Sequence, residues 1–224
     1  MIDLTTDISC CELDGRLFFL DIQNDRYFQI SPALERSLLD YLRTPDDAAA
    51  DISALSRLNL LPQTRSASRT AGAETISSPS ESLSEAPALH RRIPLSAIRD
   101  VFVAVLTMRR QLQTQRLKSI LQSLVDYRQR KSTSPANTNT EIAAGLKEAA
   151  TNFNRVRPFV PIETSCLLDS LAMVRFLAAQ GFSTRLVFAV ACDPFSAHAW
   201  VQHGSLVLNE TVGAAQAHCP IRVI

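Results

Sequence analysis

The sequence predicts an α+β fold made of two domains joined by a linker. Turn residues separate short apolar segments near the N-terminus, a polar Ser/Thr/Pro-rich stretch follows, and a helical pattern precedes strand patterns in the last third. At 224 residues and 46% apolar content, the chain is long enough for two small cores. We expect a winged-helix-like domain at 1–62, a flexible linker at 63–90 and an α+β domain at 91–224.

The first domain is predicted to be a three-stranded antiparallel meander followed by helices. Asp-Gly at 14–15 and Asn-Asp at 24–25 are turn signals, and they flank the strand-forming segments 16–22 and 26–30. An opening strand around 10–11 completes the meander. Ser31 followed by Pro32 then marks the start of a helix that continues to Leu42, and a second helix is expected at 45–58.

The linker is predicted from composition. Residues 62–88 are dominated by Ser, Thr, Ala, Pro and Glu and hold few large apolar side chains. Such a segment buries too little surface to offset the entropy lost on ordering, so we expect a flexible tether. A tether would present a peptide held on one domain to the other domain at high effective concentration.

Helices are predicted at the start of the second domain. Apolar residues at helical spacing over 95–130 indicate one long helix or two in sequence, and 141–156 forms a further helix. Residues 1–51 carry eleven acidic and four basic side chains, a net of −7, whereas 91–131 carry ten basic and two acidic, a net of +8. The basic helical face is either solvated surface or a docking site for the acidic first domain or another acidic partner.

A cysteine begins the next helix. Thr164 and Ser165 are good N-cap residues, and the apolar residues after them indicate a buried helix with Cys166 in its first turn. Gly181 is suited to end this helix in the left-handed conformation. Free backbone N–H groups and the positive end of the helix dipole favour the thiolate there, and the same N–H groups can receive an oxyanion. Cys166 is therefore a candidate nucleophile, although a buried inert cysteine remains the alternative.

Two strand segments after the helix carry a histidine and an acid. Residues 184–192 predict an interior strand, and 199–203, Gly-Ser at 204–205 and 206–208 predict a hairpin. His198 begins the first hairpin strand, and Glu210, preceded by Asn209, ends the second beside it. The order of Cys166, His198 and Asn209 or Glu210 is that of nucleophile, base and orienting group in thiol-dependent acyl transfer.

These residues support a resemblance to a known family. The pattern Cys-Leu-x-x-Ser-Leu-Ala from Cys166, then Arg-Leu-Val-Phe, His-Ala-Trp-Val and Asn followed by an acid, resembles the transglutaminase-like, papain-like core of the lasso-peptide maturation B proteins. The match covers about residues 160–210. It implies that Cys166 is the nucleophile and His198 the general base. Glu210 stands where the family more often has Asp, so either Glu210 or Asn209 could orient the imidazole.

The first domain resembles the leader-recognition element of ribosomal-peptide maturation systems. In that family an edge strand pairs with the leader peptide and the last helix supplies an apolar wall. The resemblance implies that Arg26, Tyr27 and Phe28 bind the leader together with Leu55 and Leu58. The alternative is that these are ordinary structural residues. Nucleic acid is not expected as a partner, because the net charge of −7 over residues 1–51 repels phosphate.

The resemblance implies a cysteine peptidase that removes the leader from a precursor peptide. The freed core is then closed into a macrolactam by a partner, an asparagine-synthetase-like lasso cyclase. The peptidase chemistry requires no cofactor and no metal. Two alternatives stay open: an acyl transferase of transglutaminase type, or an inert protein that binds the precursor.

We expect a cytoplasmic protein without membrane contact. The first residues lack a basic and apolar signal pattern, and no apolar run approaches the ~20 residues that span a bilayer. Five cysteines without a CxxC pair fit a reducing compartment. The pair His218 and Cys219 has no second pair at zinc-site spacing, so a metal site is not predicted.

Overall fold

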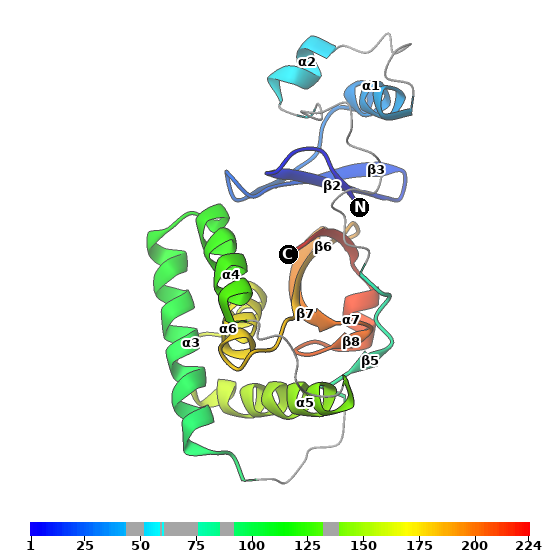
Figure 1. Cartoon of the computed structure of the whole chain (residues 1–224). Coiled ribbons are helices and arrows are strands. Elements are labelled where there is room, and N and C mark those ends of the chain that lie inside the picture. The colour runs from blue at the N-terminus through cyan, green and yellow to red at the C-terminus, as the bar shows by residue number, and fades with distance from the viewer. Residues whose placement is uncertain (44–51, 59, 61–75, 86–91, 132–138) are drawn as a thin grey trace.

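The computed structural model describes residues 1–43, 52–58, 60, 76–85, 92–131 and 139–224, and these form a mixed α+β protein as predicted (Figure 1). The N-terminal half contains β1 (Ile2–Asp3), β2 (Ile8–Leu13), β3 (Arg16–Asp21), β4 (Arg26–Phe28), α1 (Pro32–Arg43) and α2 (Ile52–Arg57). The C-terminal half contains β5 (Glu81–Ser82), α3 (Leu95–Thr114), α4 (Leu117–Lys131), α5 (Asn139–Val156), the 3-10 helix η1 (Arg157–Phe159), α6 (Cys166–Ala179), β6 (Arg185–Ala191), β7 (Ser196–His203), β8 (Leu206–Val207), α7 (Val212–Gln216) and β9 (Cys219–Val223). Among the described residues, no helix has the length and apolar character needed to cross a bilayer.

The predicted meander is present as β2, β3 and β4, and β1 adds a short strand beside β2, so the sheet order is β1-β2-β3-β4. Asp14 and Gly15 both take positive φ, 51° and 73°, at the tight turn between β2 and β3. Asp25 does the same, at 51°, before β4. Of the predicted second helix, 45–51 lies outside the described residues and α2 covers the rest.

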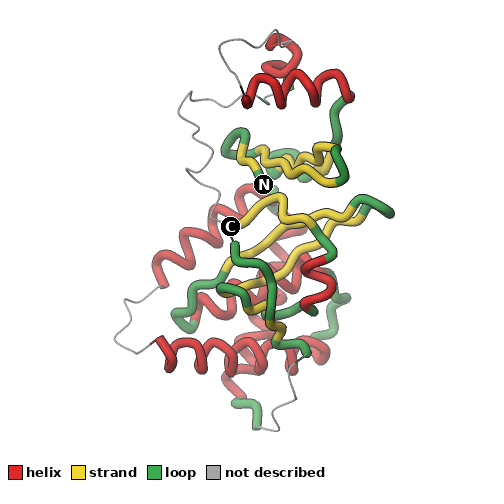
Figure 2. The backbone as a smooth tube through the Cα atoms, turned by 90° about the vertical axis from the view of Figure 1, so that its right-hand side faces the viewer, coloured by secondary structure: helices red, strands yellow, loops and turns green. Residues whose placement is uncertain are grey.

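Both faces of this sheet are buried. Leu17 and Phe19 of β3 pack toward α1 and α2, whereas Phe18 and Leu20 belong to the same buried cluster as the C-terminal helices. Figures 1 and 2, two views that differ by 90°, both show the sheet between α1 and α2 on one side and the C-terminal sheet on the other. This explains why β3 is a continuous apolar run and does not alternate with polar residues.

The two halves also meet through polar contacts. Lys118 Nζ on α4 pairs with Asp7 Oδ2 at 2.7 Å, and Arg222 on β9 donates to the Thr6 carbonyl over 2.6 Å. Lys118 is not one of the five arginines of the predicted basic face, so this contact leaves the predicted docking role of that face a prediction. Among these arginines, Arg99, Arg109, Arg110 and Arg116 are solvent-exposed, and Arg128 donates to the carbonyls of Thr184 and Ile224.

The segment 95–131 forms two helices. Gln115, at φ −131° and ψ 157°, leaves the helical region and separates α3 from α4. The buried side of α3 consists of Val101, Ala104, Val105 and Met108. Leu95, which the apolar pattern placed on the core side, is 83% exposed because it lies at the first residue of α3, beyond the reach of the core.

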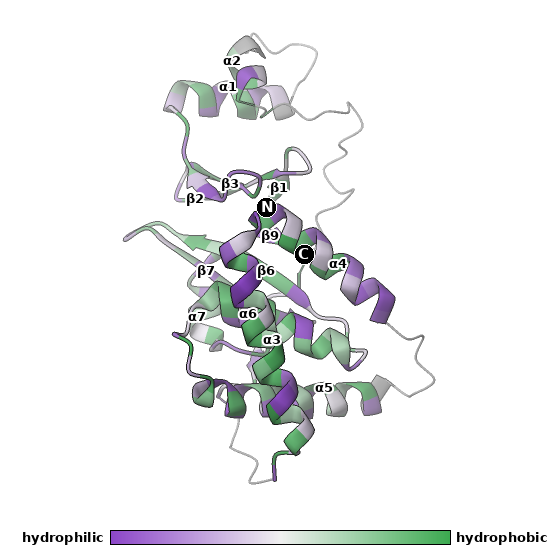
Figure 3. Cartoon of the chain, turned by 90° about the vertical axis from the view of Figure 1, so that its left-hand side faces the viewer, coloured by the Kyte–Doolittle hydropathy of each residue, from purple (hydrophilic) through white to green (hydrophobic). Residues whose placement is uncertain are grey.

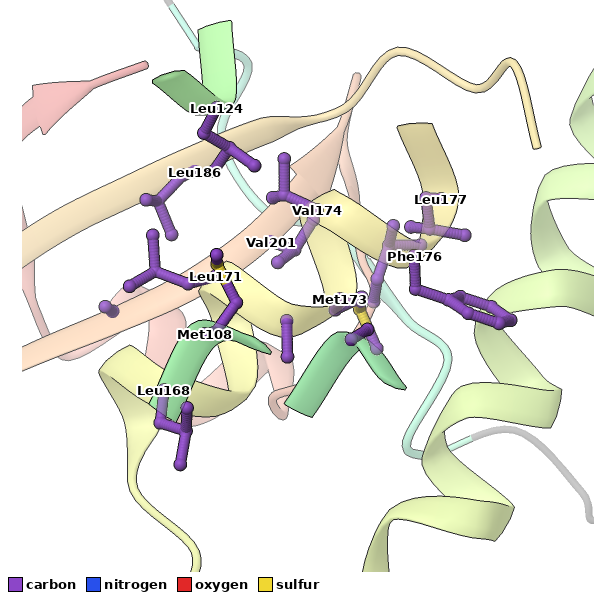
Figure 4. Packing of buried hydrophobic residues seen from close by; sticks show 14 of the residues in the cluster. Met108, Leu124, Leu168, Leu171, Met173, Val174, Phe176, Leu177, Leu186 and Val201 are labelled. Carbon is purple, nitrogen blue, oxygen red and sulfur yellow. The ribbon is translucent and has the colours of Figure 1, made fainter. Parts of the chain in front are cut away.

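The cysteine helix α6 is the centre of the C-terminal half. It is among the most apolar helices in Figure 3, and nine of its residues are buried, so its hydrophobic residues cover most of its circumference. Leu171 and Val174 of α6 lie next to Leu186 of β6 and Val201 of β7 (Figure 4). The C-terminal sheet has the order β5-β8-β7-β6-β9, and the C-terminal tail forms β9 antiparallel to β6.

Part of the predicted linker differs from the expectation. Within 63–90 the structure describes 76–85, and there Glu81 and Ser82 pair in parallel with β8 as β5. The N–H groups of Ser80 and Leu83 donate to the carbonyls of Ser205 and Val207. Main-chain pairing of this kind needs few apolar side chains, so composition alone could not reveal it. The rest of the range lies outside the described residues.

Candidate active site

Cys166 is the first residue of α6, as predicted. Ser165 takes an extended conformation before it, and its hydroxyl accepts a hydrogen bond from the Leu168 N–H, which makes Ser165 the N-cap. The thiol is partly buried and lies where the helix dipole is positive. Gly181 has φ 87°, the left-handed conformation expected after the helix.

A buried arginine fixes the chain that leads into this helix. Arg157 Nε donates to Asp169 Oδ1 at 2.6 Å, and the guanidinium also donates to the carbonyls of Ile162 and Glu163. Asp169 lies in the first turn of α6. The pair therefore holds the approach segment against the helix and limits the movement of Cys166. Sequence reasoning missed it, because an arginine between helix and loop carries no signal that it will be buried.

His198 and Glu210 meet across the β7 hairpin. The ring nitrogen Nε2 of His198 lies 2.7 Å from Glu210 Oε2. The other carboxylate oxygen of Glu210 accepts a hydrogen bond from the Thr211 N–H at 2.8 Å, and Ser82 of β5 donates to the Glu210 carbonyl. The carboxylate is thus held in place before it binds the imidazole. About a fifth of the His198 side chain and a quarter of the Glu210 side chain remain exposed.

The Cys166 thiol and the His198 ring line the same cavity, and their interaction changes both pKa values. It lowers the pKa of Cys166; burial of the thiol opposes the shift, while the positive ring and the N–H groups of Ala199 and Leu167 reinforce it. It raises the pKa of His198, with Glu210 adding to the increase against the effect of burial. Both shifts favour a thiolate beside an imidazolium.

Asn209 has a different position from Glu210. Its Oδ1 accepts a hydrogen bond from the Val201 N–H at 2.7 Å, and its Nδ2 donates to Ser170 Oγ at 2.9 Å. Ser170 Oγ in turn donates to the Ala199 carbonyl. Asn209 therefore joins α6 to the strand that carries His198. Between the two predicted orienting groups, the geometry favours Glu210 and gives Asn209 a structural role.

Cys166 and His198 line a cavity of about 150 Å³. Its C-terminal walls are apolar and are contributed by Leu117, Leu167, Phe188, Ala197 and Ala199. The remaining wall comes from the N-terminal half and consists of Leu20, Asp25 and Tyr27. The cavity therefore lies between the two halves of the chain.

The five predicted leader-binding residues fall into three places. Arg26, Phe28 and Leu58 line a second, larger cavity of about 540 Å³ next to α1. Tyr27 faces the cavity of Cys166, because successive strand residues point to opposite sides. Leu55 is a residue of α2 and is fully buried on the core side of that helix, so it is not accessible to a peptide.

The remaining metal-binding and nucleophilic residues are distributed as follows. Cys10 and Cys11 are buried in β2, as expected for small apolar side chains. His218 Nδ1 donates to the Ala214 carbonyl, and its Nε2 forms a hydrogen bond with Ser196 Oγ. Within the described parts of the chain, no three His, Cys, Asp or Glu side chains are grouped as metal ligands.

Comparison with known proteins identifies the C-terminal half. The family model of the Transglutaminase-like superfamily matches residues 104–223, which include α6, β6, β7 and the three polar groups of the site. No curated protein and no solved structure matches the chain. Members of the superfamily are typically cysteine-dependent enzymes, and the matched segment holds Cys166 and His198 on one cavity. The chain belongs to the transglutaminase-like superfamily.

Proposed function

We propose that this protein is a cysteine peptidase that removes the leader from a ribosomal precursor peptide in lasso-peptide maturation. The observation that carries the proposal is the position of His198 between the Cys166 thiol and the Glu210 carboxylate, at the edge of a cavity bounded by both halves of the chain. A thiolate activated in this way attacks acyl carbon atoms.

The first step is attack on the carbonyl at the end of the leader. The Cys166 thiolate forms a bond to that carbon, and the carbonyl oxygen becomes an oxyanion. The N–H groups of Leu167 and Ala199 help to lower the pKa of the Cys166 thiol, and we propose them as donors to the oxyanion. The imidazolium of His198 then gives its proton to the leaving amine, and the core departs with a free α-amine.

The second step is hydrolysis of the thioester. Neutral His198 takes a proton from water, the hydroxide adds to the thioester carbonyl, and the leader leaves as a carboxylic acid while Cys166 is regenerated. Glu210 keeps the ring in the orientation needed for both steps and stabilises its positive charge. The chemistry uses residues of this chain and water.

The N-terminal half supports a peptide substrate. Among the described strands, β4 pairs with β3 alone, so its outer edge offers unpaired main-chain groups. The cavity beside it is lined by Arg26, Phe28 and Leu58 and is large enough for several peptide side chains. An extended leader would add a strand to β4 and place side chains in this groove.

The test uses a lasso-type precursor peptide that carries its leader, incubated with the full-length protein, with and without a lasso cyclase and ATP. We expect mass spectrometry to detect separate leader and core. Cys166→Ala should yield intact precursor while binding it with unchanged affinity, and Cys192→Ala, a cysteine outside the site, serves as the matched control. Normal maturation by Cys166→Ala would contradict the peptidase and leave a delivery protein.

A second arm separates hydrolysis from acyl transfer. The same reaction is run with a primary amine such as cadaverine in excess. A leader that carries the free acid supports the peptidase. A leader or glutamine side chain joined to the amine, with little acid formed, would contradict it and favour an acyl transferase of the same superfamily.

A further inference from the structure

The strand β4 is shared between two cavities. Its outer residues Arg26 and Phe28 line the groove next to α1, while Tyr27 lies between them in sequence and lines the cavity of Cys166. Tyr27 is opposite Leu20 in the sheet, and both side chains face the same cavity. A residue of the N-terminal half thus forms part of the wall around the candidate nucleophile.

An aromatic contact holds Tyr27 in this position. Phe195, in the loop between β6 and β7, lies edge-on to Tyr27 with 6.1 Å between ring centroids. The same Phe195 stacks on Phe18 of β3 at 5.9 Å. Because Phe195 is just upstream of His198, these rings connect the N-terminal sheet to the strand that carries the base.

The environment of Tyr27 agrees with this placement. Burial raises the pKa of Tyr27, and negative charge on Cys166 and Asp25, which line the same cavity, raises it further. The phenol therefore stays neutral in the pH range where Cys166 is a thiolate. The ring is a neutral, rigid wall beside the reacting atom.

The size and lining of the cavity define what it can hold. Its volume of about 150 Å³ is small compared with the roughly 300–1,000 Å³ of sites for whole small molecules, so it suits a single side chain. The walls are mostly apolar. Burying a charge against them would cost free energy, and an acidic group would also meet Asp25 and the thiolate.

We propose that Tyr27 is a specificity-determining residue, which closes a pocket beside Cys166 that accepts one uncharged, small to medium-sized side chain next to the scissile bond. The inference rests on the proposed peptidase function and specifies its substrate. The N-terminal half then has two tasks on one strand: Arg26 and Phe28 face the leader groove, and Tyr27 selects the residue at the cleavage site.

The wall is tested without any substrate by alkylation of Cys166 in the full-length protein. We compare iodoacetamide with N-benzyl-iodoacetamide and measure the modification of the Cys166 peptide by mass spectrometry. Tyr27→Ala should raise the rate ratio of the bulky to the small reagent about tenfold or more, because the ring no longer blocks the larger group. Tyr27→Phe should keep the wild-type ratio within about twofold, because the ring is retained.

Two controls keep this test interpretable. Tyr127→Ala removes an aromatic ring from α4, where it contacts Arg175, and should leave the ratio unchanged. The ratio in urea-unfolded protein identifies any variant that has lost its fold, and Tyr27→Leu provides a milder change if the Ala variant unfolds. An unchanged ratio in folded Tyr27→Ala or Tyr27→Leu would overturn the inference. A ratio in Tyr27→Phe that changes as much as in Tyr27→Ala would overturn it as well, because the hydroxyl and not the ring would then matter.

The substrate preference is tested by competition between precursor variants in one tube, so that the product ratio does not depend on enzyme concentration. Variants carry Val, Trp or Asp at each residue that flanks the scissile bond. Wild type should prefer Val over Trp and Asp at one of these positions by about tenfold or more, and Tyr27→Ala should reduce the preference over Trp. Equal preferences in both proteins would overturn the inference. Absence of cleavage in wild type together with a changed alkylation ratio would instead support the wall and contradict the peptidase.

Discussion

The two halves of the molecule hold their functional residues in different ways. In the C-terminal half, both polar side-chain atoms of Glu210 and of Asn209 form hydrogen bonds. Arg157 holds the segment before α6 through its contact with Asp169. In the N-terminal half, β4 has only three residues and an open edge above a groove of about 540 Å³. Chemistry requires fixed distances, whereas recognition of an extended peptide requires free main-chain groups. The difference indicates that catalysis and binding can be disrupted separately.

The largest expected effect comes from removing the base. His198→Ala should lower the cleavage rate by roughly 10²–10⁴-fold, because neither the thiol nor the leaving amine has a proton partner. The affinity for a labelled leader peptide, measured by fluorescence anisotropy, should stay within about twofold of wild type. A parallel loss of leader affinity would contradict the separation of the two halves.

The next effect concerns the groove. Leu58 is 40% exposed and lines the groove, so Leu58→Asp places a charge there without disturbing a core. We expect the KM for precursor to rise by about 10–100-fold, with kcat at saturation unchanged within about twofold. Leu95→Asp, at an exposed position of α3, is the matched control and should change neither constant. A fall in kcat with constant KM would show that Leu58 acts on the chemistry.

A smaller effect is expected at the orienting carboxylate. Glu210→Gln removes a charge-assisted hydrogen bond worth about 1.5–3 kcal/mol, so kcat should fall by roughly tenfold or somewhat more. The pH profile should be bell-shaped, because activity requires both the thiolate and the imidazolium. The thiolate is lost as the pH falls, and the imidazolium is lost as the pH rises. Glu210 raises the pKa of His198, so its loss should move the alkaline limb to lower pH.

Glu141→Gln, at the exposed start of α5, is the control for that profile and should leave it unchanged. An alkaline limb that stays in place in Glu210→Gln would mean that the carboxylate does not act on the ring.

The smallest effect on activity is expected at Asn209. Asn209→Ala leaves the Val201 N–H without its acceptor and Ser170 without a donor, at a cost of about 1–3 kcal/mol of folding stability. The melting temperature should fall by about 2–10 °C, measured by circular dichroism. The alkaline limb should remain where it is in wild type. A shifted limb would transfer the orienting role from Glu210 to Asn209.

The sequence predicted those parts of the structure that depend on local signals. Ser165 and Gly181 mark the two ends of α6. Strand-forming residues on either side of a Gly-Ser turn mark the hairpin that carries His198. These features follow from caps and turns within a few residues. They were sufficient to place Cys166, His198 and the acid together.

Other features depend on neighbours distant in the sequence. The strand β5 forms by main-chain pairing and has no side-chain signal. Whether Tyr27 or Phe28 faces the catalytic cavity depends on which layer packs on each side of β4, and a strand pattern alone cannot assign its faces. The choice between Asn209 and Glu210 likewise depends on the path of the chain after β8. A shift of that path by one residue would exchange the side chains that face His198 and Val201.

The activated thiol at the start of α6 is the feature on which catalysis depends, and the pH dependence of Cys166 alkylation by iodoacetamide measures it directly. In wild type we predict half-maximal reactivity below the pH of about 8.5 that is typical of a free thiol, because the interaction with His198 lowers the pKa of Cys166. In His198→Ala the midpoint should return toward that value. A wild-type Cys166 that titrates like an ordinary thiol, or one whose midpoint is the same in both proteins, would contradict the account.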